Sequence, residues 1–172
     1  MDELGLKPED RPVVQPAREA AAAAIREGKG NRGVCVGAAL LLPDGSISTG
    51  KNSPILHAAG AVVLNAAKRL AGIPDRIHLL PPVVTASIAA LKRDVLGRNS
   101  VSLNLDETLI ALSVGAAMNP AAQEAMESLK TIKGCELHLT HIPASGDEAG
   151  MRRLGLNATS DPVFAGSKLF LS

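Results

Sequence analysis

The chain has 172 residues, of which 46% are hydrophobic, and its formal net charge is +1 at pH 7. This length suits one domain with a sizeable core. Phe164 and Phe170 are the only aromatic residues, whereas proteins that bind single-stranded nucleic acid need aromatic side chains for base stacking and a basic surface. The composition therefore argues against a nucleic-acid partner.

Two features of the sequence bear on the cellular compartment. Cys35 and Cys135 lie in apolar, strand-like segments, where a free thiol behaves as a small hydrophobic side chain, so a disulfide framework is not indicated. The sequence shows no secretory signal and no apolar run near the ~20 residues that span a bilayer. We therefore expect a cytoplasmic protein with no membrane partner.

Residues 1–16 are rich in proline and charge and are predicted to form a linker-like segment before a single domain, residues 17–172. Helices are predicted at residues 17–27, 56–71, 83–96, 106–118, 121–132 and about 145–155. Strands are predicted at residues 32–42, 46–49, 77–80, 135–142 and 168–171. This alternation predicts an α/β fold, a three-layer α/β/α sandwich with a mixed sheet.

Proline marks two of the predicted boundaries. Residues 43–45 read Pro-Asp-Gly, a hairpin turn in which proline sets the first φ and glycine takes a positive one. Asn119 and Pro120 end the helix at residues 106–118, because proline disfavours helical backbone at the residue before it. That helix is apolar nearly all round, which is typical of a core or interface element.

Residues 36–57 carry the most informative pattern, a hairpin followed by a helix that opens with a histidine. Zinc-dependent nucleoside deaminases have a helix that begins His-x-Glu and a Pro-Cys-x-x-Cys that supplies the remaining ligands. Here His57 is followed by Ala59 in place of the glutamate, and residues 81–85 after the predicted strand 77–80 contain no cysteine. We therefore predict a cytidine-deaminase-like core lacking the zinc motif, no metal site and no cofactor.

The loop before this helix supplies most of the candidate site residues. Lys51 brings positive charge, and Asn52 and Ser53 bring hydrogen-bonding groups next to His57. A helix amino terminus favours anions, so these residues are ligand-binding candidates for a phosphate or carboxylate. His141 is a further candidate, because it ends a predicted strand, where α/β folds bind ligands. The alternative for His57 is a helix-start residue whose imidazole satisfies a backbone group.

Two acidic pairs lie at predicted helix starts, Asp106 with Glu107 and Asp147 with Glu148. Adjacent residues on a helix point about 100° apart, so they do not converge on one atom. We therefore expect these side chains to cap helices rather than to act as paired carboxylates.

Five blocks keep their order along the chain and carry a resemblance to a known family. They are Pro-Ala-Arg-Glu-Ala (16–20), Gly-Lys-Asn-Ser-Pro (50–54), Asp-Glu-Thr-Leu-Ile-Ala-Leu-Ser (106–113), Asn-Pro-Ala-Ala (119–122) and His-Leu-Thr-His-Ile-Pro (138–143). From about residue 6 to residue 170, the chain resembles the carboxy-terminal region of a bacterial family described as domain of unknown function 1846. The resemblance implies a cytidine-deaminase-like topology but no particular catalytic residues. It also implies longer members, with an amino-terminal P-loop-like segment that this sequence lacks.

Three functions are compatible with these observations. The first is a non-catalytic domain that binds a small anionic or nucleotide-like ligand and self-associates into a homo-oligomer. The second is a metal-independent enzyme domain that acts through His57, Lys51 and Asn52 on a phosphorylated or nucleotide-like substrate. The third is a structural accessory to the P-loop-like domain. A second titratable group within hydrogen-bond distance of His57 would favour the enzyme over the binder.

Overall fold

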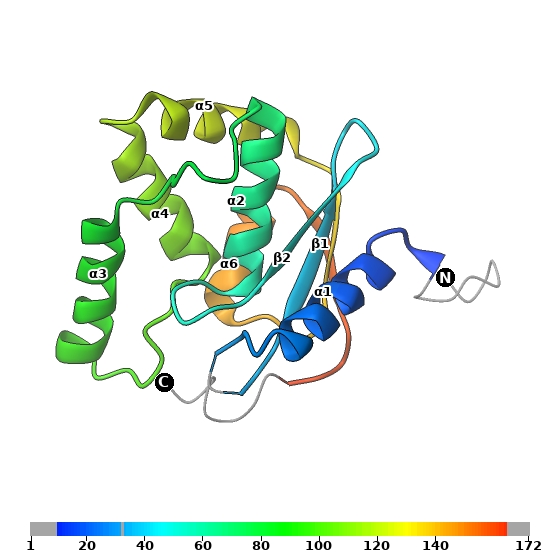
Figure 1. The fold of residues 1–172 in the computed structure, drawn as a ribbon, viewed down its shortest axis with the longest axis horizontal. Coiled ribbons are helices and arrows are strands. Elements are labelled where there is room, and N and C mark those ends of the chain that lie inside the picture. The colour runs from blue at the N-terminus through cyan, green and yellow to red at the C-terminus, as the bar shows by residue number, and fades with distance from the viewer. Residues whose placement is uncertain (1–9, 32, 165–172) are drawn as a thin grey trace.

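The structure is a computed structural model that describes residues 10–31 and 33–164 (Figure 1). The helices are α1 (Val14–Arg26), α2 (Ala58–Ala71), α3 (Pro82–Ala90), α4 (Leu105–Ala116), α5 (Pro120–Ser128) and α6 (Ser145–Arg153). A π-helical turn, η3 (Leu91–Val95), continues α3, and a 3-10 turn, η4 (Leu129–Thr131), continues α5. The strands are β1 (Gly37–Leu41), β2 (Ile47–Lys51), β3 (Glu136–Leu139) and β4 (Asn157–Ser160).

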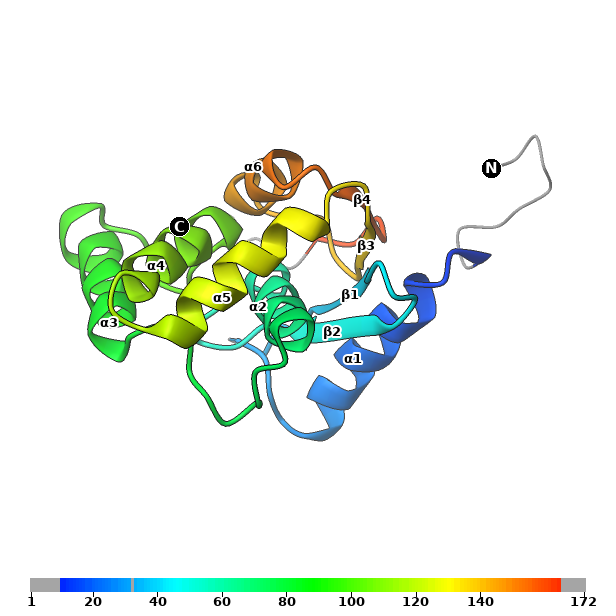
Figure 2. The same ribbon diagram turned by 90° about the horizontal axis from the view of Figure 1, so that it is seen from above.

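The four strands form one mixed sheet in the order β2-β1-β3-β4. β1 pairs antiparallel with both β2 and β3, while β3 pairs parallel with β4. Helix α1 packs on one face of the sheet and α2 on the other (Figure 2). The predicted α/β class, with a mixed sheet and helices on both sides, is therefore confirmed.

Strand β1 is apolar throughout because both of its faces are covered. Ala38 and Leu40 belong to the main core, which α2, α4 and α5 also supply. Ala39 points to the opposite face and packs with Val13 and Ala17 under α1. Successive side chains in a strand point to opposite faces of the sheet, so burial on both sides requires the continuous apolar run seen in the sequence.

Small residues let the helices lie close against the sheet. A Cβ atom on Gly37 would collide with the backbone of α1 at Ala17, and one on Gly50 would collide with the backbone of α2 at Val62. Where α2 crosses α4, a Cβ on Gly60 would lie 2.6 Å from the hydroxyl of Thr108. Glycine at these three positions therefore reflects short distances between elements, because any larger side chain there would overlap a neighbour.

The predicted strand at residues 77–80 is wrong. The segment is irregular and pairs with no strand among the described residues. Its apolar character comes from packing, since Leu79 is buried and its carbonyl would lie 2.9 Å from a Cβ on Gly115 of α4. A short apolar run fits a strand and a buried extended loop equally well.

The other strand predictions differ at their ends. The predicted strand 32–42 is shortened to β1, because the side chain of Asn52 accepts from the N–H of Val36 and donates to the carbonyl of Val34 in place of a strand neighbour. Strand β4 was missed because its polar residues are mostly exposed and show no apolar alternation. The predicted strand 168–171 lies outside the described residues.

Two helix boundaries follow the local signals in the sequence. Asn104 caps α4 with a full capping box: its side chain accepts from the N–H of Glu107, whose carboxylate accepts from the N–H of Asn104. Asn119 caps α5 by accepting from the N–H of Ala121, and Pro120 occupies the first helical position.

Among the described residues, no helix combines the length and hydropathy of a bilayer-spanning segment.

Helix α4 is less buried than its sequence suggests. One side, which includes Leu105 and Leu112, lies in the core. The opposite side exposes Ile110 and Val114, and the exposed Met118 follows just past the end of the helix. A helix that is apolar all round is a core or an interface element, and α4 joins the core through one side only.

We expect Leu112→Ala to lower the free energy of unfolding by about 2–5 kcal/mol, because it leaves a cavity at a fully buried site. Ile25→Ala on α1 is the matched control: Ile25 is 67% exposed, and surface substitutions usually stay within about 0.5 kcal/mol. Urea denaturation of both variants measures the difference. Equal stability losses would show that α4 lies at the periphery of the core.

Candidate functional site

A pocket of about 60 Å³ lies where the first turns of α2 and α6 meet the segment that follows β3. Four of the five predicted site residues line it: Asn52, Ser53, His57 and His141. Typical sites for drug-sized ligands enclose roughly 300–1,000 Å³. This pocket therefore suits a group of a few atoms, such as a phosphate or a carboxylate, with the rest of a larger ligand outside.

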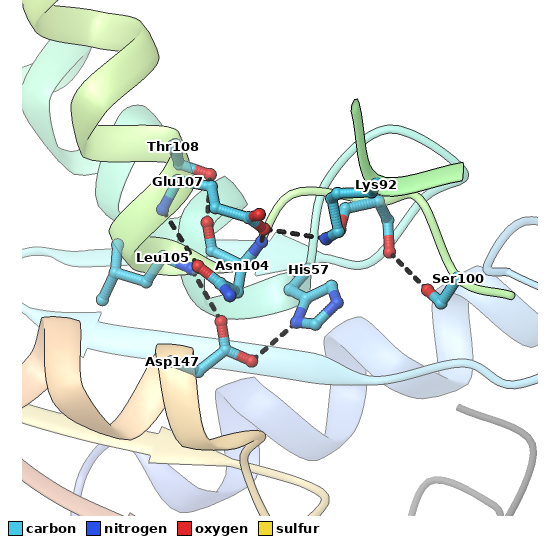
Figure 3. A network of polar contacts seen from close by, with 9 residues as sticks. His57, Lys92, Ser100, Asn104, Leu105, Glu107, Thr108 and Asp147 are labelled. Carbon is cyan, nitrogen blue, oxygen red and sulfur yellow. Dashed lines mark hydrogen bonds and ion pairs between the residues drawn. The ribbon is translucent and has the colours of Figure 1, made fainter. Parts of the chain in front are cut away.

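His57 and Asp147 form a close polar pair in this pocket (Figure 3). Nδ1 of His57 lies 2.7 Å from Oδ2 of Asp147. A carboxylate accepts hydrogen bonds and does not donate them, so Nδ1 of His57 carries the hydrogen of this bond. Nε2 has no protein partner among the described residues, and the ring is 28% exposed.

The second oxygen of Asp147 fixes the carboxylate to another helix. Oδ1 accepts from the backbone N–H of Leu105, the first residue of α4, at 2.8 Å (Figure 3). The backbone of His57 is fixed too, since its N–H donates to the carbonyl of Leu103. Both members of the pair are thus held by the segment that leads into α4, and the buried carboxylate has two partners, as a buried charge requires.

The first turn of α2 offers backbone donors beside the pair. Ala58 and Ala59 line the pocket and are buried. Their N–H groups have no acceptor among the described residues, and α2 has no side-chain cap. Unpaired N–H groups and the helix dipole favour negative charge at such an end.

Asn52 and Ser53 hold the backbone around the pocket. Both polar atoms of the Asn52 side chain bond to the backbone at residues 34–36, which keeps the segment before β1 in place. The hydroxyl of Ser53 accepts from the N–H groups of Ile55 and Leu56, which shapes the turn before α2. Their hydrogen bonds position the pocket wall.

Lys51 is the one predicted site residue that the structure does not bring to the pocket. Its ammonium group bonds Glu27 at the end of α1, at 3.0 Å. Glu27 also pairs with Lys29, and the hydrogen bonds from Lys29 and Lys51 hold the pKa of its carboxyl below the ordinary value of 4.5. The positive charge expected beside His57 is therefore engaged elsewhere.

His141, in the segment that follows β3, also lines the pocket. Its Nδ1 lies 2.8 Å from the hydroxyl of Thr140, which itself accepts from the N–H of Gly37 in β1. Burial lowers the pKa of His141 below its ordinary value of 6.5, and the charge of Asp161 opposes this shift. His141 is therefore neutral at pH 7 and supplies a polar wall rather than a positive charge.

A buried lysine supports the segment that borders the pocket. Lys92 in η3 donates to the carbonyl of Ser102 at 2.6 Å and to the carboxylate of Glu107 at 2.8 Å (Figure 3). Ser102 lines the pocket, and Glu107 belongs to the capping box of α4. Lys92 thus fixes the approach to α4, on which the His57–Asp147 pair depends.

Asp147 is the site residue that the sequence interpretation missed. It was expected to cap its own helix, but its carboxylate bonds His57, which precedes α2, and the first N–H of α4. A usable signal was present, because Pro143 precedes Asp147 by four residues, the spacing of proline and the last cysteine in Pro-Cys-x-x-Cys.

Among residues 10–31 and 33–164, no group of three or more His, Cys, Asp or Glu side chains is arranged to hold a metal ion. A catalytic zinc site usually needs three protein ligands. The ligand-type side chains lining this pocket are His57, His141 and Asp147, and they do not form such a group.

These features define an α/β domain with a small pocket that combines a His–Asp pair with free helix N–H groups. The chain belongs to the family described as "Domain of unknown function DUF1846, C-terminal", which its residues 9–170 match. It is 45% identical over 172 residues to a UPF0371 protein of Clostridioides difficile strain 630 and 44% identical over 170 residues to one of Clostridium tetani strain Massachusetts / E88. These matches cover 100% and 99% of this chain but 34% of each relative, so the chain spans about a third of their length.

A second histidine network lies outside the pocket and links α1 to the sheet. His138 on β3 is almost fully buried and contacts the hydroxyl of Thr159 and the carboxylate of Asp161. Arg18 of α1 makes two hydrogen bonds to the same carboxylate. Burial lowers the pKa of His138 below 6.5, and the hydrogen bond that the ring donates to Asp161 offsets this shift only in part.

This network predicts a loss of stability in mild acid. Because the pKa of His138 is lower in the folded state, the unfolded chain binds the proton first as the pH falls below about 6.5, and the free energy of unfolding decreases from there. The lowered pKa of Asp161 acts only below its ordinary value of 3.8. Urea denaturation between pH ~7.5 and ~5 measures the slope.

The control is a variant without the titrating group. His138→Gln should flatten the pH dependence, with the lowered pKa of His141 leaving a residual slope of the same sign. His78→Gln, at an exposed position, should keep the slope of the parent protein. Equal slopes in the parent and in His138→Gln would contradict the assignment.

Proposed function

We propose that this domain carries a metal-independent site for a small anionic or nucleotide-like ligand, at which Asp147 orients His57 for proton transfer. The observation that supports it is the 2.7 Å contact between the His57 ring and the Asp147 carboxylate inside the pocket. It supplies the second titratable group that favours an enzyme over a simple binder. A histidine oriented by a hydrogen bond to a carboxylate is an arrangement that general-base catalysis uses.

The division of labour within the pair follows from its contacts. Asp147 is held by the N–H of Leu105, so it keeps the imidazole in one tautomer and one orientation. His57 then has Nε2 free to contact a ligand. A general base or acid must lie within about 2.6–3.2 Å of the reacting group, and Nε2 is the atom that would do so. The neighbouring N–H groups of Ala58 and Ala59 would hold the anionic part of that ligand.

Inorganic phosphate is the simplest probe of this proposal. Phosphate should shift the amide resonances of Ala58 and Ala59 in NMR spectra of the 172-residue chain and should raise its melting temperature. At about a hundred times its dissociation constant, a ligand stabilises the folded state by roughly 2.7 kcal/mol. His57→Gln should remove most of this gain, because it removes the imidazole from the pocket.

Two controls separate this site from general charge effects. Lys51→Ala should leave the phosphate response unchanged, since Lys51 is paired with Glu27 outside the pocket. His78→Gln should also respond as the parent does, because His78 is exposed and does not line the pocket. An equal phosphate response in the parent and in His57→Gln would rule out the proposed site.

We also propose that the domain has a cytidine-deaminase-like topology. The hairpin of β1 and β2 leads to α2, which begins after His57, as the first part of the deaminase pattern requires. The second part of the deaminase pattern is a proline followed by the ligands of Pro-Cys-x-x-Cys. Here the first turn of α6 follows Pro143 and lines the same pocket. The meeting of these two segments at one pocket supports the proposed topology.

A second proposed function is self-association. It rests on α3 and η3, whose large apolar side chains are exposed to solvent while a lysine is buried. No residue of α3 is buried, and in η3 the buried residue is Lys92. Val83, Leu91 and Val95 are exposed instead. A helix this short is marginal in water unless an apolar face packs against something. The surface formed by these residues with Ile110, Val114 and Met118 is called the α3–α4 surface below.

The occupant that this surface fits best is a second copy of the chain. Helix α3 carries no ionisable residue, and Arg93 and Asp94 at the rim bond each other at 2.9 Å, so two copies can meet without like-charge repulsion. Helix α1 lies at the far end of the domain from α3 (Figure 1). In a longer relative, the preceding part of the chain would connect through α1 and not through the α3–α4 surface. An exposed apolar surface of this kind is typical of a protein interface.

Sedimentation equilibrium of the 172-residue chain tests the α3–α4 surface. The parent should approach twice the monomer mass as its concentration rises, whereas Leu91→Glu and Ile110→Glu should stay monomeric with unchanged circular dichroism. Ile25→Glu is the control, since Ile25 is exposed on α1. A parent that stays monomeric throughout, or dissociation by Ile25→Glu alone, would contradict self-association through this surface.

A further inference from the structure

The residues after β3 repeat the spacing of the deaminase cysteine motif. Pro-Cys-x-x-Cys places its last ligand four residues after the proline, and residues 143–147 read Pro-Ala-Ser-Gly-Asp. In this register Ala144 takes the place of the first cysteine and Asp147 the place of the second. Both line the same pocket as His57, which has the position of the histidine ligand, and Ala59, which has the position of the glutamate.

We infer that this pocket is a deaminase-type zinc site whose metal chemistry has been lost, and that the Asp147 carboxylate has replaced the metal as the partner of His57. The inference rests on the topology and the His57–Asp147 pair proposed above. It goes further by assigning each of the three ligand positions to a residue of this chain: His57, Ala144 and Asp147.

The donor set does not fit zinc as it stands. Ala144 has no side-chain atom that can bind a metal ion. Only His57 and Asp147, two of the three ligand positions, supply such an atom. Zinc bonds to nitrogen and to oxygen are each about 2.0–2.2 Å long, so tetrahedral ligands stand roughly 3.4 Å apart. Nδ1 of His57 and Oδ2 of Asp147 are 2.7 Å apart and bonded to each other, which leaves no position for an ion between them.

The replacement also changes the chemistry available at the site. A zinc deaminase uses a metal-bound water and a glutamate that moves protons. The glutamate position is Ala59 here, so proton transfer falls to His57, which is oriented by Asp147. The site thus holds a proton-transfer group where a deaminase holds its hydrolytic metal.

Restoring the missing ligands should restore metal binding. The double variant Ala144→Cys with Asp147→Cys completes a Cys₂His set, and we expect it to bind about one zinc per chain, against a trace for the parent. Cobalt offers an independent readout, because thiolate ligands give it strong absorption in the near ultraviolet. The single variant Ala144→Cys keeps the hydrogen bond from Leu105 to Asp147. In this variant zinc would replace the hydrogen between His57 and Asp147 and part the two side chains, so the His, Cys and Asp set tests the site even where the double variant fails to fold.

The controls decide whether the metal occupies this site. Ala144→Ser changes the same position without a thiolate and should bind no more zinc than the parent. Adding His57→Gln to Ala144→Cys should abolish the gain. Folded variants that take up no zinc, or that take it up equally without His57, would overturn the inference. Phosphate binding by the parent is a separate measurement, so the inference and the proposed function can fail independently.

Discussion

The carboxylate of Asp147 is the contact on which the arrangement of the pocket depends. It stands in the first turn of α6, accepts the first N–H of α4 and bonds the histidine that precedes α2. One buried charge thus ties together the beginnings of three helices. Removing one partner from a buried, hydrogen-bonded charge is costly, so the orientation of His57 and the junction of these helices are maintained by the same interaction.

This convergence depends on two glycines of α6 that lie against larger side chains at the start of α4. A Cβ on Gly146 would overlap the side chain of Asn104, and one on Gly150 would lie 2.7 Å from Leu105. Helix α6 therefore rests directly on the start of α4, close enough for Asp147 to reach the N–H of Leu105. The cost is a compact core with little tolerance for larger side chains, since extra methyl groups force neighbours apart.

The pocket and the α3–α4 surface are joined through Lys92. Its ammonium group lies inside, bonded to Ser102 at the pocket wall and to Glu107 in the cap of α4, while the apolar residues around it face outward. The ion pair thus fixes which side of η3 faces the domain. The apolar surface and the approach to the His57–Asp147 pair therefore share one structural element.

The sequence by itself determined the features that depend on neighbouring residues: the hairpin at residues 43–45, the break between helices at Asn119 and Pro120, and a histidine at the start of a helix beside a polar loop. Only the tertiary structure decided that His57 meets Asp147, which is 90 residues away, and that Lys51 turns to Glu27. It also decided that the apolar run at residues 77–80 is a loop. The physical reason is that turns and caps are set by bonds within a few residues, whereas the partner of a side chain is set by how distant elements pack.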